Sequence, residues 1–508
     1  MTAMTVLLFS IFAITGDGVD QSASDGHREV PAQPPATQMP QDRSPGRRVI
    51  RGANISVQVN VDAQGNNIVG DAANEPSIAV DPSNRNRMVI GWRQFDSIAS
   101  NFREAGWAYS QDRGGSWTFP GAIEDGTFRS DPVLAADSQG VFYYNSLAGN
   151  FQCSVFRSFD GGKTWDGGTP AFGGDKQWMC IDQTAGMGNG NIYSVWNVQF
   201  TTCGDDMTRS YDTGDSYEAC EPVPTSPRWG TMTVGKNGEL FIAGAGFVVI
   251  KSSTLQDPNE PVAYDFTAAV DLGGSIGSSS GPNPGGLLGQ ADVGVDRSDG
   301  PNGGNVYLLC SVNPPGPDPM DVSFARSEDG GMNWSNAVRI NDDSGDNWQW
   351  FATMSVAPDG RIDAVWNDTR DNPGTHMSEL YYSYSEDGGR SWRKNVAVSP
   401  SFDPSLGYPG QNKIGDYYDM RSDNEGVDIA YTATFNGEQD VYFLRITHAP
   451  VPPCPLDLNG DEQISELDVA IAIAAWAGPG ELGDVDGDGR ITVLDVLTIH
   501  DAIGLACE

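Results

Sequence analysis

The sequence is poor in basic residues and in histidine, and it has no long apolar run. Its 508 residues include 30 Lys and Arg against 68 Asp and Glu, which gives a net charge of −38 at pH 7. An acidic surface of this size repels phosphate backbones, so a nucleic-acid partner is excluded. The four histidines are too few and too scattered for a metal or triad site. No apolar run approaches the roughly 20 residues of a membrane span, so no span is expected.

Cysteine is also scarce, and the spacing of the seven cysteines points to an extracellular protein. Cys203 and Cys220 bracket a predicted hairpin, and Cys454 and Cys507 bracket the C-terminal part of the chain. Such pairs are typical of disulfides, which persist outside the cell. Three further cysteines have no evident partner: Cys153, Cys180 and Cys310.

The N-terminus has the features of an exported protein. Residues 1–20 contain the apolar stretch Val6–Ile14 and predict a secretion signal, which a polar, Pro-rich, disordered linker follows at residues 21–50. The alternative is that the apolar stretch forms a buried N-terminal strand. We therefore expect a secreted, extracellular protein, either free or attached to a cell surface.

One short pattern recurs along the chain: Ser-x-Asp-x-Gly, followed three residues later by Trp. The Asp can accept hydrogen bonds from turn amides, the Gly can take a positive φ, and the Trp can pack between sheets, so each copy predicts a tight hairpin. The copies are Ser110–Trp117, Ser158–Trp165, Ser327–Trp334 and Ser385–Trp392, with a degenerate fifth at Ser210–Tyr217. The pattern resembles the Asp-box of sialidases and other BNR-repeat β-propellers, and this resemblance implies a propeller fold.

A second pattern, an apolar strand followed by a turn and another strand, begins seven times between these boxes. The starts lie at Glu75, Asp131, Gln177, Trp229, Gln290, Trp350 and Gly415. We expect an all-β propeller of seven blades over residues 51–449, with six blades as the alternative. The segment Asn54–Val61 can pair with Asp440–Ile446 and close the ring without an open strand edge.

The C-terminal module differs in character. A Pro-rich linker at residues 450–455 precedes two acidic loops, and the region from Cys454 to Glu508 has 12 acidic residues and one basic residue. In both loops, positions 1, 3, 5, 9 and 12 carry oxygen side chains and position 7 can offer a carbonyl, which is the donor set that Ca²⁺ prefers. The expected ligands are Asp457, Asn459, Asp461, Gln463, Ser465 and Asp468, and Asp484, Asp486, Asp488, Arg490, Thr492 and Asp495.

An apolar helix is expected after each loop, and the loops start too close together for paired EF-hands. This spacing resembles a type I dockerin over residues 456–508, which implies two Ca²⁺ sites and a cohesin-like receptor as partner. Because so much negative charge opposes folding, we expect metal binding and folding of this α-helical module to be coupled. Glu462 stands where the dockerin pattern has Gly, and Val493-Leu494 occupy positions that read the cohesin.

In such a propeller the inner-strand starts and the exits of the second strands meet at one face. Arg, carboxylate and Trp residues there suit a polar or anionic sugar, because Arg can clamp a carboxylate and Trp can stack on a ring. The resemblance to sialidases implies an Arg-bound carboxylate, a Tyr nucleophile with a Glu partner, and an Asp acid/base. The catalytic candidates are Asp131, Asp416, Tyr417, Asp96 and Glu221, and the substrate-binding candidates are Arg93, Arg228, Arg370, Trp350 and Glu75.

Each candidate also has a structural interpretation. Asp131 and Asp416 can accept hydrogen bonds from backbone amides, Arg370 can pair with Asp368, and Trp350 can belong to the core. The Phe/Tyr-Arg-Ile-Pro motif of sialidases does not precede the first box; the nearest string, Phe128–Pro132, follows it.

The preferred function is a secreted, dockerin-anchored glycoside hydrolase of sialidase-like type acting on extracellular glycans, with a monomeric propeller. The alternative is a non-catalytic propeller that binds glycan or protein at the cell surface.

Overall fold

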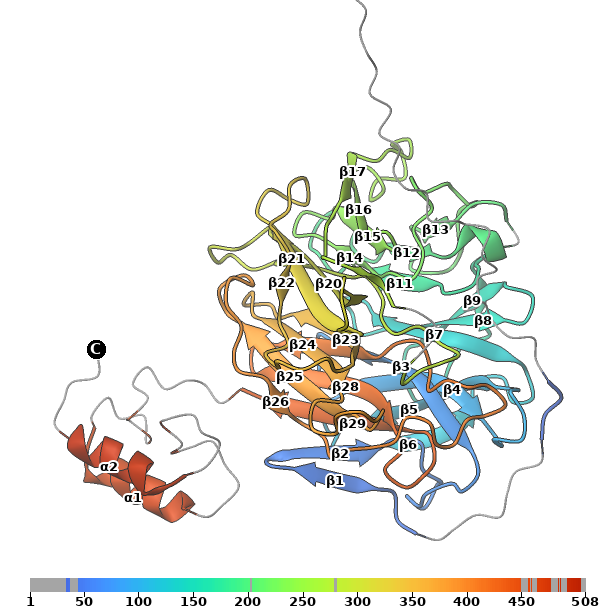
Figure 1. Cartoon of the computed structure of the whole chain (residues 1–508). Helices are drawn as coiled ribbons and strands as arrows, with labels where there is room; N and C mark the ends of the chain where they lie inside the picture. The colour runs from blue at the N-terminus through green and yellow to red at the C-terminus, as the bar shows by residue number, and fades with distance from the viewer. Residues whose placement is uncertain are drawn as a thin grey trace, which may run out of the picture.

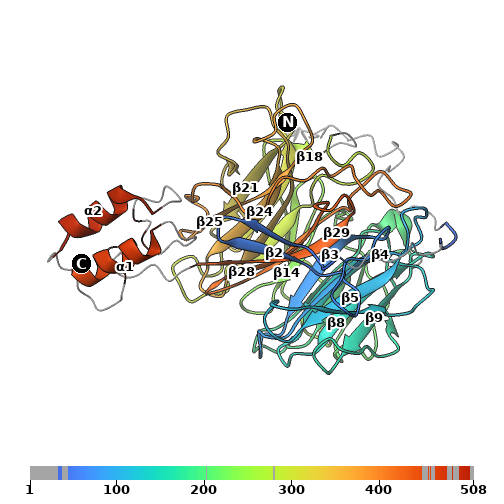
Figure 2. The ribbon, with the colours of Figure 1, turned by 90° about the horizontal axis from the view of Figure 1, so that it is seen from below.

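The computed structural model describes residues 33–36, 44–201, 203–277, 281–448, 456, 458, 464–476, 483, 485 and 491–503. Seven antiparallel sheets are arranged as blades around one axis, and two helices follow (Figures 1 and 2). This confirms the seven-bladed propeller and sets aside the alternative of six blades. No helix in the described part of the chain is long and apolar enough to cross a membrane.

The first three blades follow one another in chain order, each starting with its innermost strand. Blade 1 contains β3 (Ala72–Val80), β4 (Met88–Phe95), β5 (Glu104–Ser110) and β6 (Thr118–Ala122). Blade 2 contains β7 (Arg129–Ala136), β8 (Phe142–Ala148), β9 (Cys153–Ser158) and β10 (Thr169–Pro170). Blade 3 contains β11 (Trp178–Ile181), β12 (Ile192–Val195) and β13 (Met207–Ser210), with the short 3₁₀ helix η1 (Val198–Phe200) after β12.

The next three blades repeat the arrangement. Blade 4 contains β14 (Met232–Val234), β15 (Leu240–Gly244), β16 (Val248–Ser252) and β17 (Phe266–Ala269). Blade 5 contains β19 (Asp292–Val295), β20 (Val306–Asn313), β21 (Asp321–Ser327) and β22 (Val338–Arg339), and β18 (Ser275–Ile276) pairs with the end of β20. Blade 6 contains β23 (Gln349–Val356), β24 (Ile362–Asp368), β25 (Glu379–Ser385) and β26 (Val396–Ala397).

Blade 7 joins the two ends of the propeller. It contains β27 (Asp419–Asp423), β28 (Gly426–Ala433) and β29 (Asp440–Thr447) from the C-terminal side, and β2 (Asn54–Gln58) and β1 (Arg48–Arg51) from the N-terminal side. Strand β2 pairs antiparallel with β29, with Val57 opposite Phe443. The predicted ring closure is therefore confirmed, and β29 has no unpaired edge.

The Asp-box segments form the expected hairpin turns between the third and fourth strands. In the second copy, the Ser158 hydroxyl donates to Asp160 Oδ1 at 2.9 Å, and the amide of Thr164 donates to the same carboxylate at 3.0 Å. Equivalent bonds recur in the other copies, including the degenerate one around Asp212. These turns hold the outer hairpins and leave the inner strands to form the axis.

The core lies between neighbouring blades rather than at the axis. Between blades 1 and 2, for example, Val89, Leu134 and Tyr144 are completely buried and belong to one apolar cluster. Similar clusters separate the other pairs of blades. Because the apolar faces of the sheets pack against one another, the side chains that line the axis come from the ends of the inner strands.

The described residues of blade 3 form three strands and no fourth, and a disulfide holds the outer segment of this blade. Cys203 and Cys220 are bonded, as their spacing predicted, across a separation of 17 residues. The backbone of Glu221 pairs with Met207 next to this bridge. Cys153 and Cys310 are buried thiols and Cys180 is a half-buried one, whereas Cys454 and Cys507 lie outside the described residues.

The C-terminal module contains two helices, α1 (Glu466–Ala475) and α2 (Val493–Asp501), which Figure 1 draws in red. Ile464, Ala472 and Ile499 are buried between them. The expected secretion signal, most of the N-terminal linker, the linker at 450–455 and eight of the twelve expected calcium ligands lie outside the described residues: Asp457, Asn459, Asp461, Gln463, Asp484, Asp486, Asp488 and Arg490.

Candidate functional site

The starts of the inner strands share an unusual backbone conformation. Glu75, Asp131, Lys176, Trp229 and Phe351 have φ angles of 53°, 47°, 58°, 55° and 59°, at equivalent positions of five blades. β-Bulges accompany them in blades 1, 2 and 6. A non-glycine residue in this left-handed region costs free energy, and a bulge re-aims the side chain it carries. In blades 1, 2 and 3 that side chain is charged, and the three charged side chains lie at one end of the axis.

These charged side chains form an ion-pair network with residues from blades 1 and 7. Lys176 Nζ contacts the Asp416 carboxylate, and Lys413 Nζ lies 2.6 Å from Asp416 Oδ2 and 3.3 Å from Glu75 Oε1. Arg93 Nε lies 3.1 Å from Glu75 Oε2. The backbone amide of Lys176 donates to Asp131 Oδ2 at 3.3 Å. We call these residues, with Asp175 and Arg103, the axial charge cluster; it has four carboxyl groups and four basic groups.

Burial and the neighbouring charges shift the pKa values of this cluster in opposite directions. Burial raises the pKa of Glu75 to about 7, although Arg93 and Lys413 oppose the shift. Burial likewise raises the pKa of Asp175 to about 8. Burial would also raise the pKa of Asp416, but Lys176 and Lys413 hold it well below its usual range. The cluster therefore pairs two carboxyl groups that keep protons near neutral pH with others that are ionised.

Two polar groups of the cluster have unused hydrogen-bonding capacity. Among the described residues, neither carboxylate oxygen of Asp175 has a hydrogen-bond partner, and neither has either terminal nitrogen of Arg93. Both residues are completely buried. Unsatisfied buried groups of this kind concentrate at functional sites, but they also store strain in structural ones.

Two glycine-rich segments, one with Asn283 and Leu287 and the other with Asn412 and Gly415, cover the cluster at the end of the axis. The amide of Leu287 donates to Asp416 Oδ1 at 2.7 Å, and the side chain of Asn283 donates to the carbonyl of Gly415 at 2.8 Å. The amide of Gly285 donates to the carbonyl of Asn412 at 2.8 Å. As a result the side chains of Glu75 and Asp416 have no exposed surface.

The fold brings five of the ten propeller candidates together. Glu75, Arg93, Asp131 and Asp416 belong to the axial charge cluster, and Tyr417 follows directly in sequence. The Tyr417 hydroxyl donates to the carbonyl of Pro132 at 2.8 Å, and burial raises its pKa well above the usual value. The structural interpretation of the two aspartates is also met in part, because each accepts a hydrogen bond from a backbone amide of another segment.

The other five candidates lie elsewhere. Trp350 is completely buried in the core beside blade 7 and donates from Nε1 to Ser378 Oγ at 3.1 Å. Arg370 pairs with Asp368 at 2.8 Å in the loop after β24, as its structural interpretation predicted. Asp96 is half-buried, and burial and the charge of Asp125 raise its pKa. The guanidinium of Arg228 lies 4.4 Å from the centre of the Trp229 ring. The backbone of Glu221 forms hydrogen bonds with the backbone of Met207.

Of the four basic residues that neutralise the cluster, the sequence candidates included Arg93 but not Lys176, Lys413 or Arg103. Lys176 precedes an inner strand and carried a positional signal, since it aligns with Glu75 and Asp131. Lys413 lies three residues before Asp416, in a glycine-rich segment without a repeat pattern. Arg103 enters from the start of β5 and donates to Ser130 Oγ at 3.1 Å, and nothing in its sequence context marks it.

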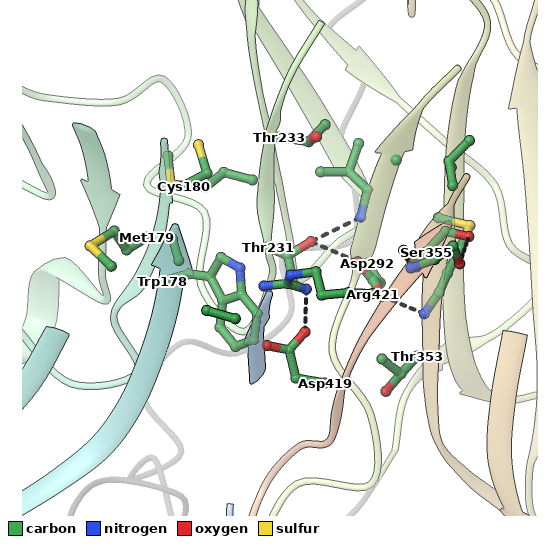
Figure 3. A pocket seen from close by; sticks show the side chains of 18 of the residues that line it. Trp178, Met179, Cys180, Thr231, Thr233, Asp292, Thr353, Ser355, Asp419 and Arg421 are labelled. Atoms are coloured by element: carbon green, nitrogen blue, oxygen red, sulfur yellow. Dashed lines mark hydrogen bonds and ion pairs between the residues drawn. The ribbon is translucent and has the colours of Figure 1, made fainter. Parts of the chain in front are cut away.

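A cavity of about 300 Å³ runs along the axis below the cluster, between the inner strands (Figure 3). Its walls include Trp178 and Cys180 of β11, Asp292 of β19, and Asp419 and Arg421 of β27. Arg421 and Asp419 form an ion pair of 2.5 Å at its centre. The axial charge cluster closes one end of this cavity, which we call the axial channel.

The two halves of the C-terminal module hold their last loop residue in the same way. Asp468 Oδ1 accepts from the amide of Leu458 at 2.7 Å, and its Oδ2 accepts from the amide of Ser465 at 2.8 Å. Asp495 makes the matching bonds, at 2.9 Å and 2.7 Å, to Val485 and Thr492. Both carboxylates are completely buried. Within the described residues no group of three or more His, Cys, Asp or Glu is placed to hold a metal.

This internal symmetry agrees with a family assignment. Residues 455–504 match the dockerin type I domain. The C-terminal module is therefore a dockerin type I domain, as its loop spacing predicted. No curated protein matches the chain.

Solved structures with a similar arrangement cover the propeller. A protein of unknown function from Dyadobacter fermentans is 16% identical over 79% of this chain and 99% of its own, with a TM-score of 0.45. The NanB sialidase from Streptococcus pneumoniae, in complex with a chlorobenzyl-ammonio-ethanesulfonate, is 12% identical over 77% of this chain and 70% of its own, with a TM-score of 0.39. At this distance, the function has to be inferred from the residues of the chain itself.

Proposed function

We propose that the chain is an extracellular docking component whose dockerin domain binds a cohesin in a Ca²⁺-dependent manner and whose propeller binds a glycan without hydrolysing it. The dockerin assignment supports the first part, since dockerins attach a protein to a scaffold and raise its local concentration there. In the second part, the absence of hydrolysis rests on the burial of the axial charge cluster.

The dockerin residues fit calcium. Asp468 and Asp495 are buried carboxylates at the twelfth position of their loops, where a loop of this type places its last oxygen ligand. Calcium in the first loop would neutralise the carboxylates of Asp457, Asp461 and Asp468, with neutral oxygens from Asn459 and Ser465 and the carbonyl of Gln463. Calcium in the second loop would neutralise the carboxylates of Asp484, Asp486, Asp488 and Asp495, with the hydroxyl of Thr492 and the carbonyl of Arg490.

Exposed apolar side chains on the dockerin helices supply a surface for the cohesin. Leu494, Val493 and Leu497 of α2 are 61%, 51% and 50% exposed, and Ile473 of α1 is 53% exposed. Apolar side chains exposed to this extent on such a small module are typical of a protein interface. They include both residues of the pair Val493-Leu494 that the sequence placed at cohesin-reading positions.

The burial of the cluster favours binding over hydrolysis in the propeller. A glycosidase carboxylate has to reach the scissile bond, yet Glu75, Asp131 and Asp416 have no exposed surface and are held by lysines, arginine or backbone amides. An ion pair between buried groups also fixes the ends of the inner strands, so the cluster has a sufficient structural role without catalysis.

Hydrolysis remains the second candidate because of one observation. The pKa of Glu75 is raised to about 7 and that of Asp175 to about 8 in the vicinity of ionised Asp416. Carboxyl groups with separated pKa values are typical of a general acid with its ionised partner.

The test uses the full chain with Ca²⁺ on a glycan panel that includes sialosides, scored for binding and for released sugar. We expect binding without release. Sugar release that Glu75→Gln or Asp416→Asn abolishes, while each variant is still folded at the assay temperature, would establish the hydrolase instead. Neither binding nor release would direct the search to a protein ligand and overturn the glycan proposal.

The docking part has its own test. A panel of type I cohesins is titrated with the full chain in Ca²⁺ and in EDTA, and we expect at least one to bind in Ca²⁺ alone. Leu494→Asp should remove that binding and leave the helical circular-dichroism signal in Ca²⁺ unchanged. Cohesin binding that persists in EDTA, or that Leu494→Asp does not weaken, contradicts the proposed interface.

A further inference from the structure

The axial channel is open at the end opposite the cluster. The residues that follow the inner strands of blades 1, 5 and 6 (Pro82, Arg297 and Pro358) line this end and are exposed, whereas the residues at the other end are buried. The hairpins between first and second strands surround the opening, next to the Asp-box turns. Arg113 of the first box, for instance, pairs with Glu425 of the blade 7 hairpin at 2.7 Å. The channel is thus distinct from the face where the catalytic candidates meet.

One cation of the channel, Arg421, is held in place across the axis. Its Nη1 donates to Asp419 Oδ1 at 2.5 Å and to the carbonyl of Met420 at 2.8 Å, and its Nη2 donates to the carbonyl of Leu134 in blade 2 at 3.4 Å. Figure 3 shows its guanidinium between Trp178 and Asp419. The side chain is still 37% exposed, so one part of the guanidinium faces the channel.

The second cation of the channel is Arg297. In the described part of the chain it forms no hydrogen bond and no ion pair, although it lines the channel. Among the nearby charges, Asp182 attracts its guanidinium and Arg421 repels it. Two guanidinium groups that repel one another beside a partly enclosed space favour the entry of an anion.

The carboxylates of the channel are already engaged. Asp419 Oδ2 accepts from Ser77 Oγ at 2.7 Å and from the amide of Ile78 at 3.0 Å, in addition to its ion pair with Arg421. Asp292 accepts from Thr231 Oγ1 at 2.9 Å and from the amide of Met354 at 2.7 Å. Burial raises the pKa of Asp292 to about 7, which reduces its negative charge near neutral pH. Neither carboxylate is placed to neutralise Arg297.

We propose that the axial channel binds a small organic carboxylate, of about monosaccharide size, whose charged group lies between Arg297 and Arg421. Hydroxyl groups from Thr233, Ser355 and Ser422 line the same space and can hydrogen-bond to the rest of the ligand. A cavity of about 300 Å³ is at the small end of ligand sites, which excludes a polymer chain from the interior. The site is independent of the cohesin interface and of hydrolysis at the cluster.

The test is calorimetric titration of the full chain, in Ca²⁺ and low salt, with glucuronate as probe and glucose as the neutral match. We expect glucuronate to bind and glucose not to bind. Arg297→Gln should weaken glucuronate about tenfold, and because Arg297 forms no hydrogen bond or ion pair with any described residue, its removal breaks no such bond. Arg48→Gln, which removes an exposed arginine on the outer strand β1, is the matched control and should change nothing.

The outcomes separate clearly. Failure of glucuronate to bind, or binding that Arg297→Gln leaves unchanged, overturns the proposal. Equal binding of glucose would show that the charge is not recognised and would overturn it as well. The glycan panel is a separate test. The difference in glucuronate binding between the wild type and Arg297→Gln reports on the channel alone, so its failure would leave the proposed glycan binding of the propeller untouched.

Cys180 provides a second measurement that does not require affinity. Its thiol is half-buried in the channel wall, while the other two thiols of the propeller are buried. Methanethiosulfonate reagents with a sulfonate or a trimethylammonium group are compared, and labelling is located by mass spectrometry with Cys180→Ser as control. Arg297→Gln should lower the ratio of the anionic rate to the cationic rate about tenfold. An unchanged ratio would mean that Arg297 does not set the potential of the channel.

Discussion

The axial charge cluster leads to a quantitative prediction about Lys176. This residue is completely buried, contacts Asp416, and holds the backbone of blade 3 against Asp131. Replacing it by Met preserves the volume of the side chain and removes its charge, while the ion pair of Asp416 with Lys413 at 2.6 Å remains. Breaking a buried ion pair from one side costs about 3–5 kcal/mol. Because Lys413 remains, we expect the lower end, about 3 kcal/mol.

A double-mutant cycle tests the origin of this cost. Asp416→Asn alone should also destabilise the propeller, because it leaves two lysines without their shared carboxylate. The double variant should cost less than the sum of the single ones, with a coupling free energy of about 1–3 kcal/mol. The assay is urea unfolding at pH 7 followed by tryptophan fluorescence, since nearly all tryptophans belong to the propeller. Lys163→Met, in an exposed turn, is the control.

The pH dependence has a definite sign. The pKa of Asp416 is held well below its usual range, so its ionised form stabilises the fold above the unfolded pKa of about 4. Loss of Lys176 should therefore cost most at neutral pH and progressively less as the pH falls and Asp416 is protonated in the variant. A cost below about 0.5 kcal/mol, or zero coupling, would refute the buried network and with it the argument for a closed, non-hydrolytic site.

Three further predictions concern other parts of the chain. Cys220→Ser should cost about 3 kcal/mol, the loop-closure value for a loop of this length, and a reducing agent should destabilise the wild type but not the variant. The pKa values of Glu75 and Asp175 are raised to about 7 and 8, so the folded propeller binds more protons than the unfolded chain. Its melting temperature should therefore fall as the pH rises from about 5 to about 8, and Glu75→Gln should flatten that slope. A melting temperature that rises over this range would contradict the raised pKa values. EDTA should remove the helical circular dichroism of α1 and α2 while the near-ultraviolet signal of the propeller stays unchanged; helices that persist in EDTA would show that calcium and folding are not coupled.

Much of the fold could be predicted because its signals are local. An Asp-box specifies a hairpin within eight residues, and the bonds around Asp160 are those that its sequence requires. Each blade is a run of such hairpins, so counting inner-strand patterns gave seven blades. The Cys203–Cys220 pair and the spacing of the dockerin loops are also short-range features, and the pairing of β2 with β29 followed from the strand that blade 7 lacked.

The candidate site depended on contacts that no local pattern encodes. The sequence supplied polar residues at the starts of the inner strands, but it did not indicate which of them would meet. Lys176 and Asp416 are separated by 240 residues, and their contact exists because the ring closes. Trp350 stands at an inner-strand start like Glu75, yet it is completely buried in the core, and the neighbouring Phe351 has the positive φ instead.

The amino-acid sequence by itself therefore determined the hairpins, the number of blades, the closing strand and the dockerin loops, because hydrogen bonds and spacing within a few residues decide each of these. Only the tertiary structure decided that the expected active face is a buried network of ions and that Arg297 enters an open channel at the other end. The physical reason is that the direction of a side chain at the axis depends on a bulge and one positive φ angle, and its electrostatic environment on charges from other blades.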